Sequence, residues 1–212
     1  METQEIFSIK PFALIVAIDA KTNGIGYENR LPWQRIPEDV EMFRNVTNDR
    51  SPDSRFEVPD AKNILIMGRK TYESLGGITL ENKNRTMVVI SETMESKSGL
   101  WSFTSLREAL IFFSNYHHKT DRIFVIGGAR LYSEAMTYRE CKTLYISRIH
   151  HSKALEVDTF FPPISETYSL HSSSPVTSKD CDINFELWKR REDAVKASEA
   201  EEHHSEEYHS EE

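Results

Sequence analysis

The chain has 212 residues, of which 38% are hydrophobic and 10% aromatic, so it is long enough for one domain with a sizeable core. Of its 34 acidic and 26 basic residues, nine acids and one lysine fall between Glu192 and Glu212, so residues 1–191 hold 25 of each. This balance excludes a strongly basic surface for nucleic acid. We therefore predict one domain over residues 1–191 and an acidic, disordered tail over residues 192–212.

The compartment is predicted from the apolar runs and the cysteines. The longest apolar run, Phe12 to Ile18, is too short to span a bilayer, and the N-terminus is acidic where a signal peptide would be basic. Cys141 and Cys181 have no Cys-x-x-Cys spacing and are predicted to be free thiols. These features predict a cytoplasmic protein without a membrane partner. No metal site is predicted, because the tail histidines at 203, 204 and 209 lack a fixed carboxylate or Cys partner.

The first half of the chain begins with Phe12–Ile18, whose continuous apolar run is typical of a central buried strand. A loop rich in Gly and Pro follows, and a helix begins just after Pro37. Ser51–Asp60 is polar with two prolines and is predicted to be a surface insertion. Two further strands, Asn63–Met67 and Arg85–Ile90, flank a short helix, Arg69–Leu75, which Gly76-Gly77 ends.

The second half continues the alternation of helices and strands. A helix is predicted around Leu106–Phe113, a strand over Ile123–Ile126, a helix after Gly127-Gly128 and a strand over Leu144–Ser147. Asn184–Trp188 alternates like a closing antiparallel strand. The pattern predicts an α/β domain with a mostly parallel central sheet, an antiparallel C-terminal strand and about four flanking helices.

Asp39 is the most informative single residue. It lies in the first turn of the helix after Pro37, beside the apolar face formed by Val40, Phe43 and Val46. A carboxylate held against apolar side chains is costly unless a partner binds it, which favours a functional group. The helix dipole also favours an acid in the first turn, and an isolated acid at this position is more often a structural cap than a catalytic group.

Two strand ends have the features of phosphate sites. Met67–Thr71 places two cations and a hydroxyl at a helix N-terminus, and Gly127-Gly128 lets a ligand approach the backbone closely. Either motif alone is common turn chemistry, and neither is the Gly-x-Gly-x-x-Gly fingerprint. Together they predict an elongated ligand with more than one phosphate across the carboxyl ends of the strands.

In combination these motifs resemble the dihydrofolate reductase family, from about Phe12 to Arg191. The motifs that carry the resemblance, in chain order, are Ile25-Gly26, Leu31-Pro32-Trp33, Met67-Gly68-Arg69-Lys70-Thr71, Arg85 before Ser91, Ile126-Gly127-Gly128 with Tyr132, Asp158–Pro162 and Phe185-Glu186-Leu187. The resemblance implies NADPH-dependent reduction of 7,8-dihydrofolate to 5,6,7,8-tetrahydrofolate, which supplies one-carbon metabolism and nucleotide synthesis. It also implies a monomer and inhibition by antifolates.

The resemblance assigns the chemistry to Asp39 and Trp33. One ionised carboxylate can accept both adjacent N–H donors of the pteridine, which fits Asp39. Protonation at N5 would depend on Asp39 through a water that Trp33 helps to hold, while hydride passes to C6. Burial should raise the pKa of Asp39. Glu38 is interpreted as an ordinary first-turn acid.

The resemblance also implies the substrate contacts. Leu31 and Phe43 would sandwich the pterin and benzoyl rings, although both also suit core packing. Arg85 would pair with the α-carboxylate of the glutamate tail. Ser147 falls where the family usually has Thr and keeps the hydroxyl that bonds the acid.

For the cofactor, the loop from Ile25-Gly26 to Leu31 would close over the nicotinamide. Ala17 and Ile126 would line the nicotinamide side, with Ile126 also assigned to the substrate, and the Gly127–Gly128 peptide would be cis. Glu92 departs from the basic or neutral residue that relatives often carry near the 2′-phosphate, so looser selection against NADH is a further expectation. The remaining expected cofactor contacts are Arg69, Lys70, Thr71, Ser91, Ala129, Arg130, Leu131 and Tyr132.

Two alternatives fit parts of this pattern. A pyrimidine reductase of riboflavin synthesis shares the fold, but its substrate has no glutamate tail for Arg85 to neutralise. An inert folate- or nucleotide-binding module would be expected to lack Asp39 or Ile25-Gly26, and the sequence keeps both. The sequence has no thymidylate synthase domain after residue 191, so we expect the single-function form.

Overall fold

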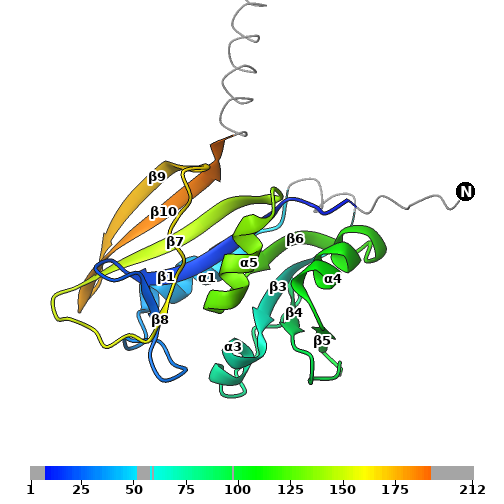
Figure 1. Ribbon diagram of the computed structural model, residues 1–212, viewed down its shortest axis with the longest axis horizontal. Coiled ribbons are helices and arrows are strands. Elements are labelled where there is room, and N and C mark those ends of the chain that lie inside the picture. Colours follow the sequence, from blue (N-terminus) through cyan, green and yellow to red (C-terminus); the bar gives the residue numbers. More distant parts are fainter. Residues whose placement is uncertain (1–7, 52–57, 59, 97, 192–212) are drawn as a thin grey trace, which may run out of the picture.

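The computed structural model describes residues 8–51, 58, 60–96 and 98–191. The predicted tail and most of the predicted Ser51–Asp60 insertion lie outside this part of the chain. An eight-stranded sheet in the order β5-β4-β3-β6-β1-β7-β10-β9 forms the centre of the molecule (Figure 1). Its strands are β1 (Phe12–Asp19), β3 (Lys62–Gly68), β4 (Arg85–Ile90), β5 (Leu100–Phe103), β6 (Thr120–Val125), β7 (Cys141–His151), β9 (Tyr168–Thr177) and β10 (Cys181–Arg190).

In the order of the sheet, the six strands β5, β4, β3, β6, β1 and β7 are parallel to one another. Strand β10 is antiparallel to β7, and β9 is antiparallel to β10. The predicted mostly parallel sheet is confirmed. The predicted antiparallel C-terminal strand is confirmed as β10, and it forms a hairpin with a strand that was not predicted, β9. Strand β9 was missed because it is an edge strand whose mostly exposed residues include Ser172–Ser174 and Pro175, so it shows no apolar alternation.

A second, two-stranded sheet joins β2 (Gly24–Gly26) to β8 (Thr159–Phe160). These strands and β5 were also not predicted, because runs of two to four residues carry too little periodicity. The small sheet links the loop after β1 to the long connection after β7.

The helices cover both faces of the large sheet. Leu14 and Val16 of β1 belong to the core cluster under α4 (Leu106–Ile111) and α5 (Ala129–Thr137). Ala13 and Ile15 face the other way, against α1 (Pro37–Asn48), while α3 (Arg69–Ser74) packs beside β3 and β4 on the same side. Helix α4 continues into a π-helical turn, Phe112–Tyr116. The four predicted helices are therefore present.

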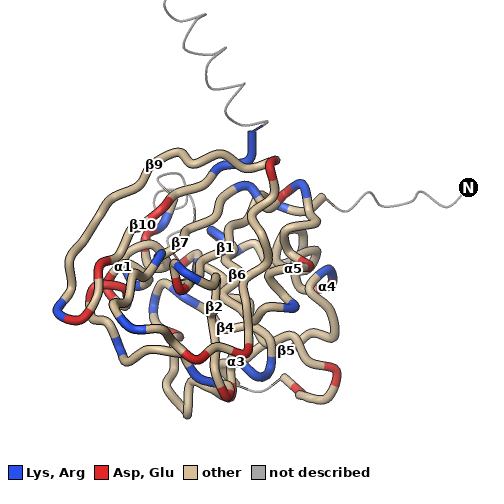
Figure 2. The backbone as a smooth tube through the Cα atoms, turned by 60° about the vertical axis from the view of Figure 1, so that its left-hand side comes forward, with Lys and Arg blue, Asp and Glu red and all other residues tan. Residues whose placement is uncertain are grey.

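The surface carries mixed charge, and the two cysteines are buried. Positive and negative residues are interspersed along the tube in Figure 2. Cys141 and Cys181 are buried and unpaired, as predicted. In the part of the chain that the structure describes, no helix has the length and apolar character needed to cross a membrane.

Candidate active site

The two predicted phosphate sites lie side by side at the carboxyl ends of β3 and β6. The backbone N–H of Gly68 donates to the Gly127 carbonyl at 2.8 Å. The Gly127–Gly128 peptide is cis, as expected, and Gly127 has a φ of 127°. A Cβ on Gly128 would lie 3.3 Å from Thr71 Oγ1, so glycine keeps the space between the two helix starts open.

Asp39 lies in the first turn of α1, near the middle of the sheet. Burial raises the pKa of its carboxyl group, and the nearby Ser147 hydroxyl partly offsets this rise in the pKa. Ser147 pairs in register with Ala17 on β1 and with Phe185 on β10, which places it inside the sheet, and its hydroxyl lies beside Asp39. Although Ser147 Oγ is buried, it lacks hydrogen-bond geometry to any group among the described residues. A half-buried carboxylate beside a buried hydroxyl is an arrangement suited to a ligand with polar N–H groups.

Tyr132 fixes the wall behind Asp39. Its hydroxyl donates to the Ile15 carbonyl at 2.8 Å, and its ring meets Phe161 edge to face at 5.2 Å. Burial, and then the charge of Asp39, raise the pKa of the Tyr132 phenol, so it remains a neutral donor.

Trp33 is buried in the segment that leads into α1. It is 7% exposed, packs with Ile36 and Cys181, and stacks on His151 with ring centroids 6.2 Å apart. This fixed position suits the predicted role of holding a water near Asp39.

Arg85 is the first residue of β4 and is 7% exposed. Its Nη1 donates to Thr47 Oγ1 at 3.0 Å, and its Cζ lies 6.0 Å from the centroid of the Phe43 ring. Phe43 and Thr47 are one turn apart, so α1 presents both to the guanidinium. Burial, and then the positive charge of Arg44, lower the pKa of Arg85.

The Nε of Arg85 is buried and, within the described part of the chain, has no hydrogen-bond partner. A desolvated cation beside a second cation is stabilised when an anion binds it. The surroundings of the Arg85 guanidinium are therefore suited to a carboxylate.

The loop after β2 lies across a cavity from α3. Leu31 is 56% exposed, and Tyr27 and Arg30 bond through their backbones at 2.9 Å in both directions. Asp158 anchors the loop, because its Oδ2 accepts from the Glu28 N–H at 2.8 Å. That bond, and then one from the Thr159 hydroxyl, lower the pKa of Asp158, so it is ionised at neutral pH.

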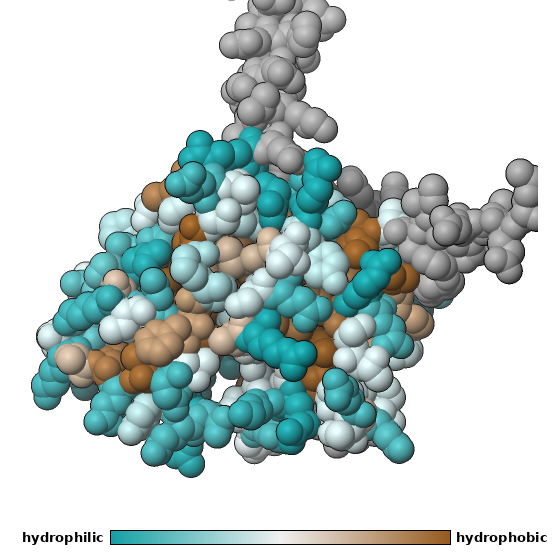
Figure 3. All heavy atoms as spheres, in the orientation of Figure 1, coloured by the Kyte–Doolittle hydropathy of each residue, from teal (hydrophilic) through white to brown (hydrophobic). Residues whose placement is uncertain are grey.

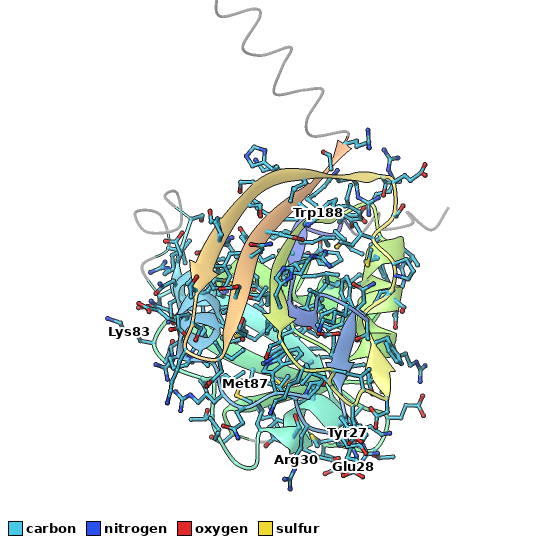
Figure 4. The ribbon with its side chains drawn as sticks, turned by 90° about the vertical axis from the view of Figure 1, so that its left-hand side faces the viewer. Tyr27, Glu28, Arg30, Lys83, Met87 and Trp188 are labelled. Carbon is cyan, nitrogen blue, oxygen red and sulfur yellow. The ribbon has the colours of Figure 1, made fainter. Side chains whose placement is uncertain are left out.

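A cavity of about 490 Å³ separates this loop from α3, and the space-filling view shows an opening between them (Figure 3). Tyr27, Glu28 and Arg30 lie together at the end of the molecule that holds α3 (Figure 4). Charges of both signs line the cavity, and Arg69 is paired with Glu73 at 2.8 Å. The lining residues are Glu28, Asn29, Arg30, Arg69, Lys70, Glu73, Ser74 and Gly76.

The remaining predicted cofactor residues lie along the same edge of the sheet. Ser91 follows β4 directly, and its hydroxyl accepts from the backbone N–H groups of Thr93 and Met94 at 3.2 and 3.1 Å. Glu92 is exposed beside it. Ala129, Arg130 and Leu131 form the first turn of α5, and Ile126 connects β6 to the glycine pair.

Sequence reasoning missed the side chains that hold this site in place. Thr47 had no signal, because a hydroxyl inside a helix usually bonds backward, as Thr47 does to the Phe43 carbonyl at 2.6 Å. The contact of Asp158 with the loop joins residues 130 positions apart, which no local pattern reveals.

Asp158→Ala is expected to lower kcat/KM roughly tenfold, because the loop would close less often over the groove once its carboxylate anchor is lost. Steady-state kinetics measure this effect. Asp158→Asn keeps an oxygen that accepts from Glu28 and should retain most of the activity. Equal losses in the two variants would contradict the anchoring role.

The fold defines an α/β protein whose candidate site lies at the carboxyl ends of a mostly parallel sheet, where such folds bind elongated ligands. A family model described as dihydrofolate reductase matches residues 11–190. The chain therefore belongs to the dihydrofolate reductase family.

Individual relatives agree with this assignment. The chain is 35% identical over 160 residues to the dihydrofolate reductase of Pneumocystis carinii, covering 72% of this chain and 74% of that protein. It is 28% identical over 197 residues to that of Candida albicans, covering 84% and 97%. It also matches the bifunctional dihydrofolate reductase-thymidylate synthase of Paramecium tetraurelia at 31% identity over 177 residues, which cover 84% of this chain and only 34% of that relative.

Proposed function

We propose that this chain is an NADPH-dependent oxidoreductase that reduces 7,8-dihydrofolate to 5,6,7,8-tetrahydrofolate. Family membership supports the reaction. The observation that carries it to this site is the half-buried Asp39 carboxyl group, with its raised pKa, beside the buried Ser147 hydroxyl. A pteridine that presents adjacent N–H groups supplies further donors to the Asp39 carboxylate.

Asp39 binds and orients the pteridine, and it controls the proton delivered to N5. Its raised pKa brings it closer to neutral pH, where a group that manages protons works best. Trp33 is fixed by its contacts with His151 and Cys181 and holds the water between Asp39 and N5. Tyr132 keeps its own proton and closes the site from behind.

The residues present fit a dinucleotide. The glycines at 127 and 128 leave room that a Cβ would fill, and Thr71 Oγ1 lies beside them. Lys70 and Arg69 line the cavity next to the loop, where they can meet phosphate groups. When bound, NADPH supplies the hydride that reduces C6. Ala17 and Ile126 are proposed to orient the nicotinamide, and Ala129, Arg130, Leu131, Ser91 and Glu92 to line the rest of the cofactor site.

The glutamate tail is proposed to end at Arg85. The buried, unpartnered Nε and the Phe43 ring beside the guanidinium suit a benzoylglutamate, with Leu31 on the loop side. This observation disfavours the pyrimidine reductase, whose substrate has no such tail. We also propose that the protein is a cytoplasmic monomer with one enzymatic domain over residues 1–191, and that antifolates bind in the same groove.

In the decisive experiment, dihydrofolate is added to a mixture of the protein and NADPH, and the absorbance of NADPH is followed over time. Steady oxidation that depends on both substrates is the expected result. A folded protein that binds NADPH, measured by fluorescence titration, but oxidises it only with a tail-less pyrimidine substrate would contradict the proposal.

A further inference from the structure

The turn between β9 and β10 touches the start of α1, far away in the sequence. Ser178 Oγ donates to Glu38 Oε2 at 2.7 Å, and the bond joins residues 140 positions apart. The turn itself is closed by a bond of 2.9 Å from the Ser178 N–H to the Cys181 carbonyl. The hairpin end is therefore a defined structure that holds its hydroxyl against the helix.

Apolar packing reinforces this contact. Cys181, the first residue of β10, is buried in one cluster with Trp33 and Ile36, which precede α1. Burial raises the pKa of the Cys181 thiol, and the charges of Glu38 and, more weakly, Asp39 raise it further. The hairpin end thus lies against the chain segment that leads into Asp39.

Helix α1 begins with Pro37, which favours a helix start, but the side chain of its N-cap residue does not cap it. Its N-cap residue, Ile36, has a side chain that cannot accept a hydrogen bond, and its first intrahelical bond, from the Val40 N–H to the Ile36 carbonyl, measures 3.1 Å. The first turn of a helix without a side-chain cap leaves N–H groups unsatisfied and frays. Asp39 belongs to that turn, so its position depends on what holds the turn.

We propose that Glu38 and Ser178 form a latch between the β9–β10 hairpin and α1 that positions Asp39 in the groove. Neighbouring residues on a helix point about 100° apart, so Glu38 faces the hairpin while Asp39 faces the groove. Glu38 is a positioning residue that does not touch the substrate. This inference rests on the proposed role of Asp39, and it gives Glu38 more than the ordinary first-turn role expected from the sequence.

The test separates the bond from the charge. Ser178→Ala removes the bond and keeps the Glu38 charge, whereas Glu38→Gln removes the charge and keeps an acceptor for Ser178. We expect Ser178→Ala and Glu38→Ala each to lower kcat/KM roughly three- to tenfold, mainly through kcat, with the double variant no worse than the single ones. Glu38→Gln should remain within roughly twofold of the wild type, as should the exposed controls Ser174→Ala and Glu41→Ala.

Two measurements that need no turnover complete the test. In Ser178→Ala the first turn should open to water, so the Val40 amide should exchange its hydrogen faster and the pKa of Asp39, followed by NMR, should fall toward its ordinary value. The titratable residues Glu38, Tyr132 and Cys181 near Asp39 are all kept in this variant, and of these only Glu38 loses a hydrogen bond.

Additive losses in the double variant would overturn the latch, as would Val40 exchange and an Asp39 titration in Ser178→Ala that match the Ser174→Ala control. A fully active Asp39→Asn would instead contradict the proposed role of Asp39. In that case the exchange and titration data still decide whether the latch exists.

Discussion

Asp39→Asn is expected to lower kcat for dihydrofolate reduction roughly 100- to 10,000-fold at neutral pH, the range typical of a lost acid–base group. The amide keeps the shape of the carboxylate and one acceptor oxygen. It cannot carry the charge that binds two N–H donors, and it cannot influence the proton that reaches N5. Activity should partly recover at low pH, where solvent protonates the substrate directly. The absorbance of NADPH, followed across a pH series, measures both effects.

The same substitution should stabilise the fold at neutral pH. Burial raises the pKa of Asp39 above its ordinary value of 3.8, so ionisation costs more free energy in the folded state than in the unfolded chain. The wild type therefore loses stability as the pH rises from below 3.8 through the raised pKa, and the Asn variant lacks this loss. Urea unfolding at several pH values measures the difference. Glu41→Gln, an exposed acid on the same helix, should change neither stability nor activity.

The sequence contained enough to predict most of the central sheet. Runs such as Phe12–Ile18 are buried on both faces, so the need to bury them is visible in composition alone. Strand β9 could not be found this way, because an edge strand with one solvated face and a polar sequence is stabilised by its partner β10 and not by its own apolar residues.

The candidate site likewise has residues that the sequence predicted and contacts that it did not. Asp39 and the glycines at 127 and 128 were singled out by their positions at a helix start and at a strand end, and Arg85 was assigned by the resemblance to the family. The supporting contacts, Thr47 with Arg85 and Ser178 with Glu38, were not predicted. Serine and threonine are common on surfaces, and only tertiary packing decides which of them meets a buried charge.

Arg85→Leu is expected to affect substrate binding and stability in opposite directions. A carboxylate bound by a buried guanidinium gains charge-assisted hydrogen bonds of about 1.5–3 kcal/mol each. Loss of these bonds in the leucine variant should raise KM for dihydrofolate roughly 10- to 100-fold. Without substrate, Arg85 is a desolvated cation with an unpartnered Nε and a positively charged neighbour, Arg44, which the pKa lowered by burial and by Arg44 reflects. Leucine of similar volume should therefore leave stability unchanged or increase it.

Kinetics and urea unfolding on the same preparations separate these two effects of Arg85→Leu. Lys83→Leu is the matched control, since Lys83 is an exposed cation two residues away that points out into solvent (Figure 4), and its loss should leave KM nearly unchanged. A dihydropterin without the glutamate tail should react equally well with Arg85→Leu and the wild type, because the Arg85 contact depends on the tail carboxylate. A loss of similar size with the tail-less substrate would show that Arg85 acts on the fold of the groove and not on the glutamate. The stability data are independent of that outcome: a clear destabilisation by leucine would mean that the bond from Arg85 to Thr47 outweighs the cost of burying the charge.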